Sequence, residues 1–155
     1  MAEILSRQVS RIAATSTGYG KRLPSDQGRL TCITFTSPAT AAWANGDTIA
    51  SGVVLPVGTR FPVGSQCSHE AMGASVVADV GTRDPVTLTA IDADGIAASI
   101  SVASAGRDAL NSGAFVKSGA EYVTTAAAEI YATLSGATPT ANAQIRFDIF
   151  VILPG

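Results

Sequence analysis

The chain contains one histidine, His69, and it is followed directly by Glu70. An imidazole next to a carboxylate is a typical combination for general acid–base catalysis. On a strand, however, adjacent side chains point to opposite faces, so these two would not act together. A serine or cysteine nucleophile would also depend on His69 as its base, and no G-x-S-x-G motif accompanies it. We therefore favour a structural or exposed His69 and expect no catalytic residues and no enzyme activity.

Cys32 and Cys67 are the two cysteines of the chain. A zinc site built from them would need more histidines or a C-x-x-C pair, and the sequence has neither. We expect both thiols to be buried and reduced, because an unpaired cysteine behaves as a small apolar residue. The sequence leaves open whether the two cysteines form a disulfide, since a disulfide requires Cα atoms within about 7 Å of each other.

Residues 92–95 (DADG) begin like a calcium-binding EF-hand loop, in which the twelfth position is a bidentate glutamate. Here that position is Ala103, so the ligand set is incomplete. The four residues are instead typical of a hairpin turn, in which aspartate accepts backbone N–H bonds and glycine adopts a positive φ. We therefore expect no metal and no other cofactor.

The composition favours a protein that works in an assembly. Charged residues make up 14% of the 155 residues and hydrophobic residues 46%. Soluble domains contain about 25% charged residues, so much of this surface must consist of small neutral side chains. Such a surface loses little hydration when another protein covers it, which favours an obligate assembly over a free enzyme. The net charge of −2 argues against nucleic acid as the main partner.

The sequence predicts neither a membrane span nor export. It has no apolar run of about 18 residues, the length that a spanning helix needs. Arg7 and Arg11 interrupt the apolar stretch near the N-terminus, so no secretory signal is predicted. We expect the protein to be made and used without export, in a compartment where cysteines stay reduced.

The N-terminal segment differs in charge from the remainder of the chain. Residues 1–29 contain five basic and two acidic residues, a net charge of +3, whereas residues 30–155 contain five basic and ten acidic residues, a net charge of −5. We predict an extended arm over residues 1–29, either disordered in solution or ordered on an acidic partner, and a β-sandwich domain over residues 30–155. The candidate partner-binding residues of the arm are Arg7, Arg11, Lys21 and Arg22.

Beyond the arm, apolar residues recur at every second position between closely spaced turn signals, the pattern typical of short strands. The alternation predicts strands over residues 30–36, 48–55, 60–63, 75–80, 86–90, 96–102, 115–123, 129–134 and 145–153. Turns or loops are predicted at residues 38–47, 81–85, 92–95, 106–113 and 136–142. The alanine-rich region 91–109 could alternatively form a short helix. This pattern predicts an all-β fold, an antiparallel β-sandwich of the jelly-roll type.

The last predicted strand is apolar on both faces near its end. Ile149, Val151 and Leu153 share one face, while Phe150 and Ile152 lie on the other. A strand of this kind is either central in its sheet or covered on its outer face by a neighbouring subunit. Because a single sandwich buries only one face of each sheet, Phe150 and Ile152 are the candidate oligomer interface.

Three segments carry a resemblance to a known group of proteins: LPVGTRF at residues 55–61, EAMGASVVADVG at residues 70–81 and GATPTANAQIRFDIFVIL at residues 136–153. Together they resemble a strand corner, a turn with its strand, and the closing hairpin of small jelly-roll capsid decoration (cement) proteins and related virion proteins of tailed bacteriophages. The resemblance implies a homotrimer on the capsid surface of the virion that contacts the major capsid protein and has no catalytic residues. It also implies assembly in the cytoplasm of the host cell. The expected function is therefore stabilisation of the phage head.

Two alternatives remain open at this point. A tail, neck or fibre-base component with the same fold would also fit, for example an adhesive one that binds a glycan near Trp43 and Tyr122. A small cupin-like enzyme ranks last, because it would need a cluster of metal-binding histidines.

Overall fold

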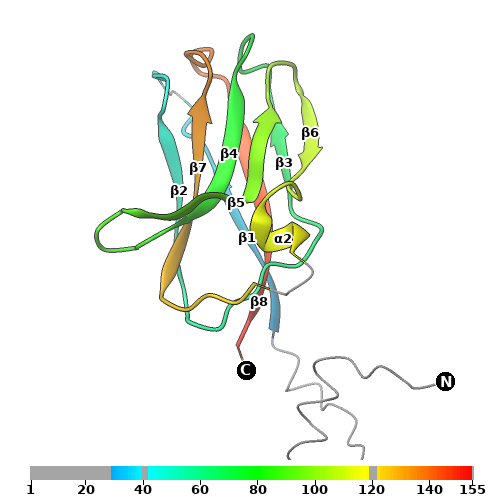
Figure 1. The fold of residues 1–155 in the computed structure, drawn as a ribbon. Coiled ribbons are helices and arrows are strands. Elements are labelled where there is room, and N and C mark those ends of the chain that lie inside the picture. The colour runs from blue at the N-terminus through cyan, green and yellow to red at the C-terminus, as the bar shows by residue number, and fades with distance from the viewer. Residues whose placement is uncertain (1–28, 40–41, 119–121, 155) are drawn as a thin grey trace, which may run out of the picture.

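The computed structural model describes residues 29–39, 42–118 and 122–154, and in these segments nearly all regular structure is β (Figure 1). Eight strands form two four-stranded antiparallel sheets that pack face to face, as predicted for an all-β sandwich. The elements in chain order are β1 (Arg29–Thr36), β2 (Thr48–Leu55), β3 (Gln66–His69), β4 (Val77–Arg83), β5 (Ala90–Ser101), β6 (Gly106–Ala109), the single-turn helix α2 (Ala114–Lys117), β7 (Ala128–Ser135) and β8 (Ile145–Leu153).

The strand pairing is that of a jelly roll. One sheet has the order β1-β8-β3-β6 and the other the order β2-β7-β4-β5. Thus the first strand pairs with the last, the second with the seventh, the third with the sixth and the fourth with the fifth, all antiparallel. This nested pairing is what results when one long hairpin is rolled into two Greek keys.

The core lies between the sheets and follows the alternation of the strands. Ile33 and Phe35 of β1 face inward, and so do Phe147, Ile149 and Val151 of β8. The rings of Phe35 and Phe147 stack with their centroids 5.0 Å apart. Since β8 lies between β1 and β3, it is a central strand, one of the two explanations that its sequence allowed.

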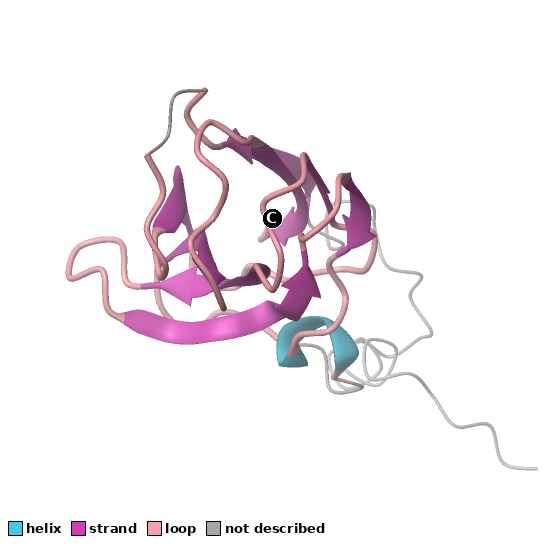
Figure 2. Cartoon of the chain, turned by 90° about the horizontal axis from the view of Figure 1, so that it is seen from above, coloured by secondary structure: helices cyan, strands magenta, loops and turns pink. Residues whose placement is uncertain are grey.

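A second group of aromatic rings closes one end of the sandwich. Phe115 on α2 stacks on Tyr122 at a centroid distance of 3.6 Å, and Phe61 lies 5.5 Å from Phe115. The strand predicted over residues 115–123 is therefore wrong where the structure describes that region. Gly113 is instead the N-cap residue of α2, and its carbonyl accepts the backbone N–H of Lys117. Figure 2 shows α2 at one end of the long strand β5.

The hairpin turn predicted at residues 92–95 is also wrong, because these residues lie inside β5. The turn lies earlier and overlaps the end of the one predicted at residues 81–85, of which residues 81–83 belong to β4. In it the Asp84 carboxylate accepts the backbone N–H groups of Val86 and Thr87 at 2.8 and 2.7 Å. Those two N–H groups lower the pKa of Asp84. The strand predicted over residues 86–90 is thus mostly this turn, which extends beyond the body of the sandwich in both views (Figures 1 and 2). The helix considered for residues 91–109 does not form.

Two short strands were not predicted from the sequence. Residues 106–109 form β6 rather than a loop, and Gln66–His69 form β3. The edge strand predicted at residues 60–63 is reduced to two isolated bridges that Arg60 makes with Val123 and Ile152. A four-residue strand is too short to show an alternation, so only its pairing with a neighbour reveals it. Here that pairing is β3 between β8 and β6.

Candidate functional site

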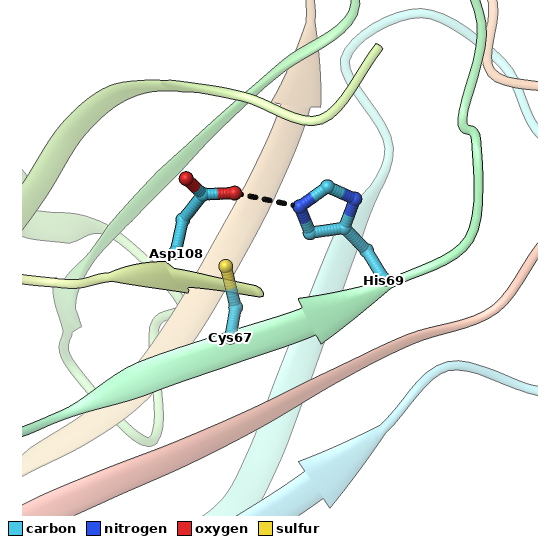
Figure 3. A group of neighbouring side chains, drawn as sticks. All are labelled: Cys67, His69 and Asp108. Atoms are coloured by element: carbon cyan, nitrogen blue, oxygen red, sulfur yellow. Dashed lines mark hydrogen bonds and ion pairs between the residues drawn. The ribbon is translucent and has the colours of Figure 1, made fainter. Parts of the chain in front are cut away.

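The fold places Cys67, His69 and Asp108 together on the inner side of one sheet (Figure 3). Cys67 and His69 are two positions apart on β3, so their side chains share a face. Asp108 is the register partner of Cys67 on the neighbouring strand β6. One ligand atom from each residue, the sulfur, a ring nitrogen and a carboxylate oxygen, lies within 4.8 Å of the other two. We call these three residues the β3–β6 cluster.

His69 is held by two oxygen atoms. Its Nε2 lies 2.8 Å from Oδ2 of Asp108, and its Nδ1 lies 3.1 Å from the carbonyl oxygen of Glu70. The His69 side chain is 1% exposed, whereas that of Asp108 is 46% exposed. The cluster is therefore buried on the histidine side and reaches solvent through the aspartate.

The sequence-based expectation that His69 and the Glu70 carboxylate do not act together is confirmed. The Glu70 side chain is on the exposed side of the chain, and its Oε2 accepts the backbone N–H of Gln144 at 2.8 Å. The acidic partner of His69 is instead Asp108, which is 39 residues away in the sequence. The sequence analysis missed this pair because it predicted a loop at residues 106–113. The strand β6, which brings Asp108 next to His69, was not expected there.

Cys67 is completely buried, and burial raises the pKa of its thiol to about 11. The nearby Asp108 charge raises it further, while the backbone N–H of Asp108 lowers it. Both ring nitrogens of His69 already face oxygen atoms, so neither is free to take the thiol proton. The geometry therefore differs from that of a cysteine nucleophile, which needs a base in hydrogen-bond contact.

Cys32 lies on the other face of its strand, which corrects the expectation of two buried thiols. In β1 the alternation points Ile33 and Phe35 inward and Cys32 outward, where it is exposed. Both cysteines are free, so the possible disulfide does not form.

We expect the two thiols to differ sharply in reactivity. In the presence of a chelator, and in solution dilute enough for the chains to be separate, Ellman's reagent should label Cys32 within minutes at pH 8 and leave Cys67 unmodified until the protein unfolds. The reason is that only the thiolate attacks, and burial keeps Cys67 protonated up to about pH 11. Mass spectrometry of the labelled peptides checks the assignment, with Cys32→Ser as the control. Equal labelling of both cysteines in the folded protein would contradict the buried position of Cys67.

Phe150 and Ile152, the candidate oligomer interface, are half-buried on the outer face of β8. Other segments of the same chain lie against Phe150 and Ile152. Ser65 Oγ accepts the backbone N–H of Phe150 at 2.9 Å, and Arg60 exchanges two backbone hydrogen bonds with Ile152. In the register with β1, Phe150 is opposite Cys32 and Ile152 is opposite Leu30, whose side chains share this outer face. We call Leu30, Cys32, Phe150 and Ile152 the outer patch.

The candidate arm residues Arg7, Arg11, Lys21 and Arg22 lie outside the described residues. Trp43 and Tyr122, considered together for glycan binding, lie near opposite ends of the sandwich. Trp43 precedes the start of β2 and donates its indole N–H to the Ala143 carbonyl at 3.2 Å. Tyr122 precedes the start of β7, which pairs with the end of β2. The two aromatic side chains therefore do not form one site.

No helix in the described part of the chain is long and apolar enough to cross a membrane.

Comparison with known proteins finds a similar fold but no sequence relative. No protein-family model matches the sequence, and no curated protein matches it. Among solved structures, the chain is similar to a chain described as "Cyanophage Pam1 capsid asymmetric unit". The TM-score is 0.54 at 13% sequence identity, and the match covers 92% of this chain and 96% of the other. The two chains share a fold over nearly their whole described length.

Proposed function

We propose that this protein is a structural component of a tailed-bacteriophage virion, and specifically a decoration protein that binds the major capsid protein and stabilises the head. The observation that carries the proposal is the fold match to a chain of a cyanophage capsid asymmetric unit, which spans nearly all of both chains. The three sequence segments that resemble phage decoration proteins support the same role independently.

The surface of the sandwich offers apolar side chains for contacts with other proteins. Leu30 in the outer patch is 61% exposed. Val86 and Leu88, in the turn between β4 and β5, are 87% and 56% exposed at a point that extends beyond the sandwich. A protein with two such separate areas can contact its own copies through one and the capsid through the other. The proposed assembly is a homotrimer formed through the outer patch.

We expect a trimer in light scattering at micromolar concentration, and we expect Leu30→Asp to shift it to monomer. A carboxylate in the centre of the interface would be buried without a partner, which typically costs about 3 kcal/mol per contact. Leu30 is exposed in the single chain, so the variant should still fold. Val86→Asp is the matched control and should remain trimeric. A monodisperse monomer of the unaltered protein would contradict the self-association.

Contact with the capsid is proposed to involve the basic arm. Its net charge of +3 suits an acidic surface, and several weak contacts in one trimer raise the avidity without strengthening any single contact. β1 begins at Arg29, so the arm joins the sandwich where β1 pairs with the end of β8. The described residues place the outer patch next to this junction.

Deletion of residues 1–22 should leave the melting temperature nearly unchanged and weaken binding to phage heads by about tenfold or more. The described core begins at β1, which the deletion leaves intact. Co-sedimentation with heads that lack the protein measures the binding, and the difference from the full chain should shrink as salt is added. A control with Arg7, Arg11, Lys21 and Arg22 changed to glutamine separates charge from length. Failure of the truncated chain to fold would contradict an arm outside the core.

The location in the particle tests the proposal most directly. Antibody labelling of virions should show many copies distributed over the head, and heads without the protein should release DNA at a lower temperature. A small number of copies confined to the tail or neck would favour the alternative of a tail, neck or fibre-base component.

A further inference from the structure

In the β3–β6 cluster, both ring nitrogens of His69 face an oxygen atom of the protein. Nδ1 of His69 faces the Glu70 carbonyl oxygen, and Nε2 faces the Asp108 carboxylate. A carbonyl and a carboxylate oxygen both accept hydrogen bonds, whereas a neutral imidazole has one N–H donor. If Nδ1 donates to Glu70, the lone pair of Nε2 points at a carboxylate oxygen 2.8 Å away. A hydrogen atom or a metal ion must therefore lie between Nε2 and Oδ2.

We propose that Cys67, His69 and Asp108 bind a zinc-like divalent cation, which links the edge strand β6 to β3. The three donors are a sulfur, an imidazole nitrogen and a carboxylate oxygen, all of which bind Zn²⁺. They lie within 4.8 Å of one another and come from two paired strands, so the backbone already holds them near a common centre. The fourth position of a tetrahedral ion would be filled by water on the side where Asp108 is exposed.

The partner of Nδ1 supports metal binding. Histidine ligands usually donate their second ring N–H to a carbonyl or carboxylate, which fixes the tautomer and directs the other nitrogen at the metal. The Glu70 carbonyl takes this role at 3.1 Å. Zinc bonds of about 2.0–2.3 Å require ligand atoms roughly 3.3–3.8 Å apart, so Oδ2 would move away from Nε2 by less than about 1 Å. Asp108 is half-exposed on an edge strand and has room for this shift.

The charges of the cluster would balance. A thiolate at Cys67 and a carboxylate at Asp108 together neutralise a divalent cation, which leaves no net charge at a buried position. The basic neighbour Arg107 is directed to the opposite face of β6, where its Nε donates to Ser68 Oγ at 3.2 Å. The thiol proton must leave when the metal binds, so binding should release protons and weaken as the pH falls.

Cobalt substitution tests the site with a readout specific for sulfur. The full chain without a histidine tag is freed of metal with a chelator, and Co²⁺ alone is then added. We expect one Co²⁺ per chain, a sulfur-to-cobalt charge-transfer band in the near ultraviolet and visible bands typical of tetrahedral cobalt. Zn²⁺ should displace the cobalt, abolish these bands and raise the melting temperature by several degrees.

Three variants and two controls locate the binding. Cys67→Ser should remove the charge-transfer band, and His69→Gln and Asp108→Asn should weaken cobalt binding by at least about tenfold. Cys32→Ser and Asp148→Asn, which alter an exposed thiol and a carboxylate outside the cluster, should change neither. Asp108→Asn keeps the proposal testable if the two buried substitutions prevent folding.

Two results would overturn the proposal. One is a folded, metal-free chain that takes up no stoichiometric Co²⁺ or Zn²⁺ and keeps its melting temperature in their presence. In that case an ordinary hydrogen bond between His69 and Asp108 accounts for their 2.8 Å contact. The other is a charge-transfer band that survives in Cys67→Ser, which would place the thiolate ligand elsewhere in the chain.

Discussion

Gly81→Ala is expected to lower the free energy of unfolding by about 3 kcal/mol, a large effect for the addition of one methyl group. Gly81 lies in the middle of β4, and a Cβ there would collide with the carbonyl oxygen of Asp92 and the backbone of Ala93 on β5. Backbone atoms of a paired strand cannot rotate away as a side chain can, so the two strands would have to separate locally. Urea unfolding followed by the fluorescence of the single tryptophan, Trp43, measures the change.

Gly106→Ala is the matched control for this prediction. Gly106 also lies in a strand, and the nearest atom to an added Cβ, in the His69 ring, would be at an ordinary contact distance of 3.8 Å. Its effect should stay within about 0.5 kcal/mol. Equal effects of the two substitutions would show that β5 does not approach β4 as closely as described.

Arg83→Met is expected to destabilise the fold by about 3 kcal/mol, because it leaves the carboxylate of Glu129 buried without its counter-ion. Arg83 Nε lies 2.8 Å from Glu129 Oε2, and the two side chains are 13% and 10% exposed. Another partner of that carboxylate, the backbone N–H of Gly52 at 3.0 Å, carries no charge. The guanidinium also lies over the Tyr131 ring, 5.3 Å from its centroid, and this contact would be lost as well.

A double variant and a surface pair separate charge from packing. Arg83→Met combined with Glu129→Met should recover most of the lost stability, because no unpaired ion remains. Arg146→Met breaks an ion pair of the same 2.8 Å length, but Arg146 is 49% exposed. Its cost should be at most about 1 kcal/mol. If Arg146→Met and Arg83→Met cost the same, burial of the Arg83–Glu129 pair does not determine its contribution.

Alternation along the chain was sufficient to predict the strands that run through the middle of the sheets. The inward faces of β1 and β8 follow directly from every second residue being apolar, since a strand turns successive side chains to opposite sides. The same alternation predicted the strand around Val76, Ala78 and Val80, all of which are completely buried. From such strands the sandwich class followed without knowledge of their partners.

Alternation predicted turns at both residues 81–85 and residues 92–95, but it did not show which of them joins β4 to β5. Both the DADG segment and the region around Asp84 have the composition of a turn, and local propensity does not choose between them. The choice depends on Gly81 and Gly95, whose missing side chains make room for β5 against β4 and for the Phe115 ring. A Cβ on Gly95 would lie 2.6 Å from that ring. Gly95 of the DADG segment is therefore needed for close packing and not for a positive φ.

The sequence by itself determined the fold class and the direction of most core side chains, because these depend on a repeat of two residues that is visible along the chain. The tertiary structure alone decided which polar groups meet. His69 and Asp108 are 39 residues apart, and they come together through the pairing of two four-residue strands. Such short strands have no repeat to detect. The β3–β6 cluster therefore follows from the pairing of β3 with β6 and could not be predicted from the local sequence.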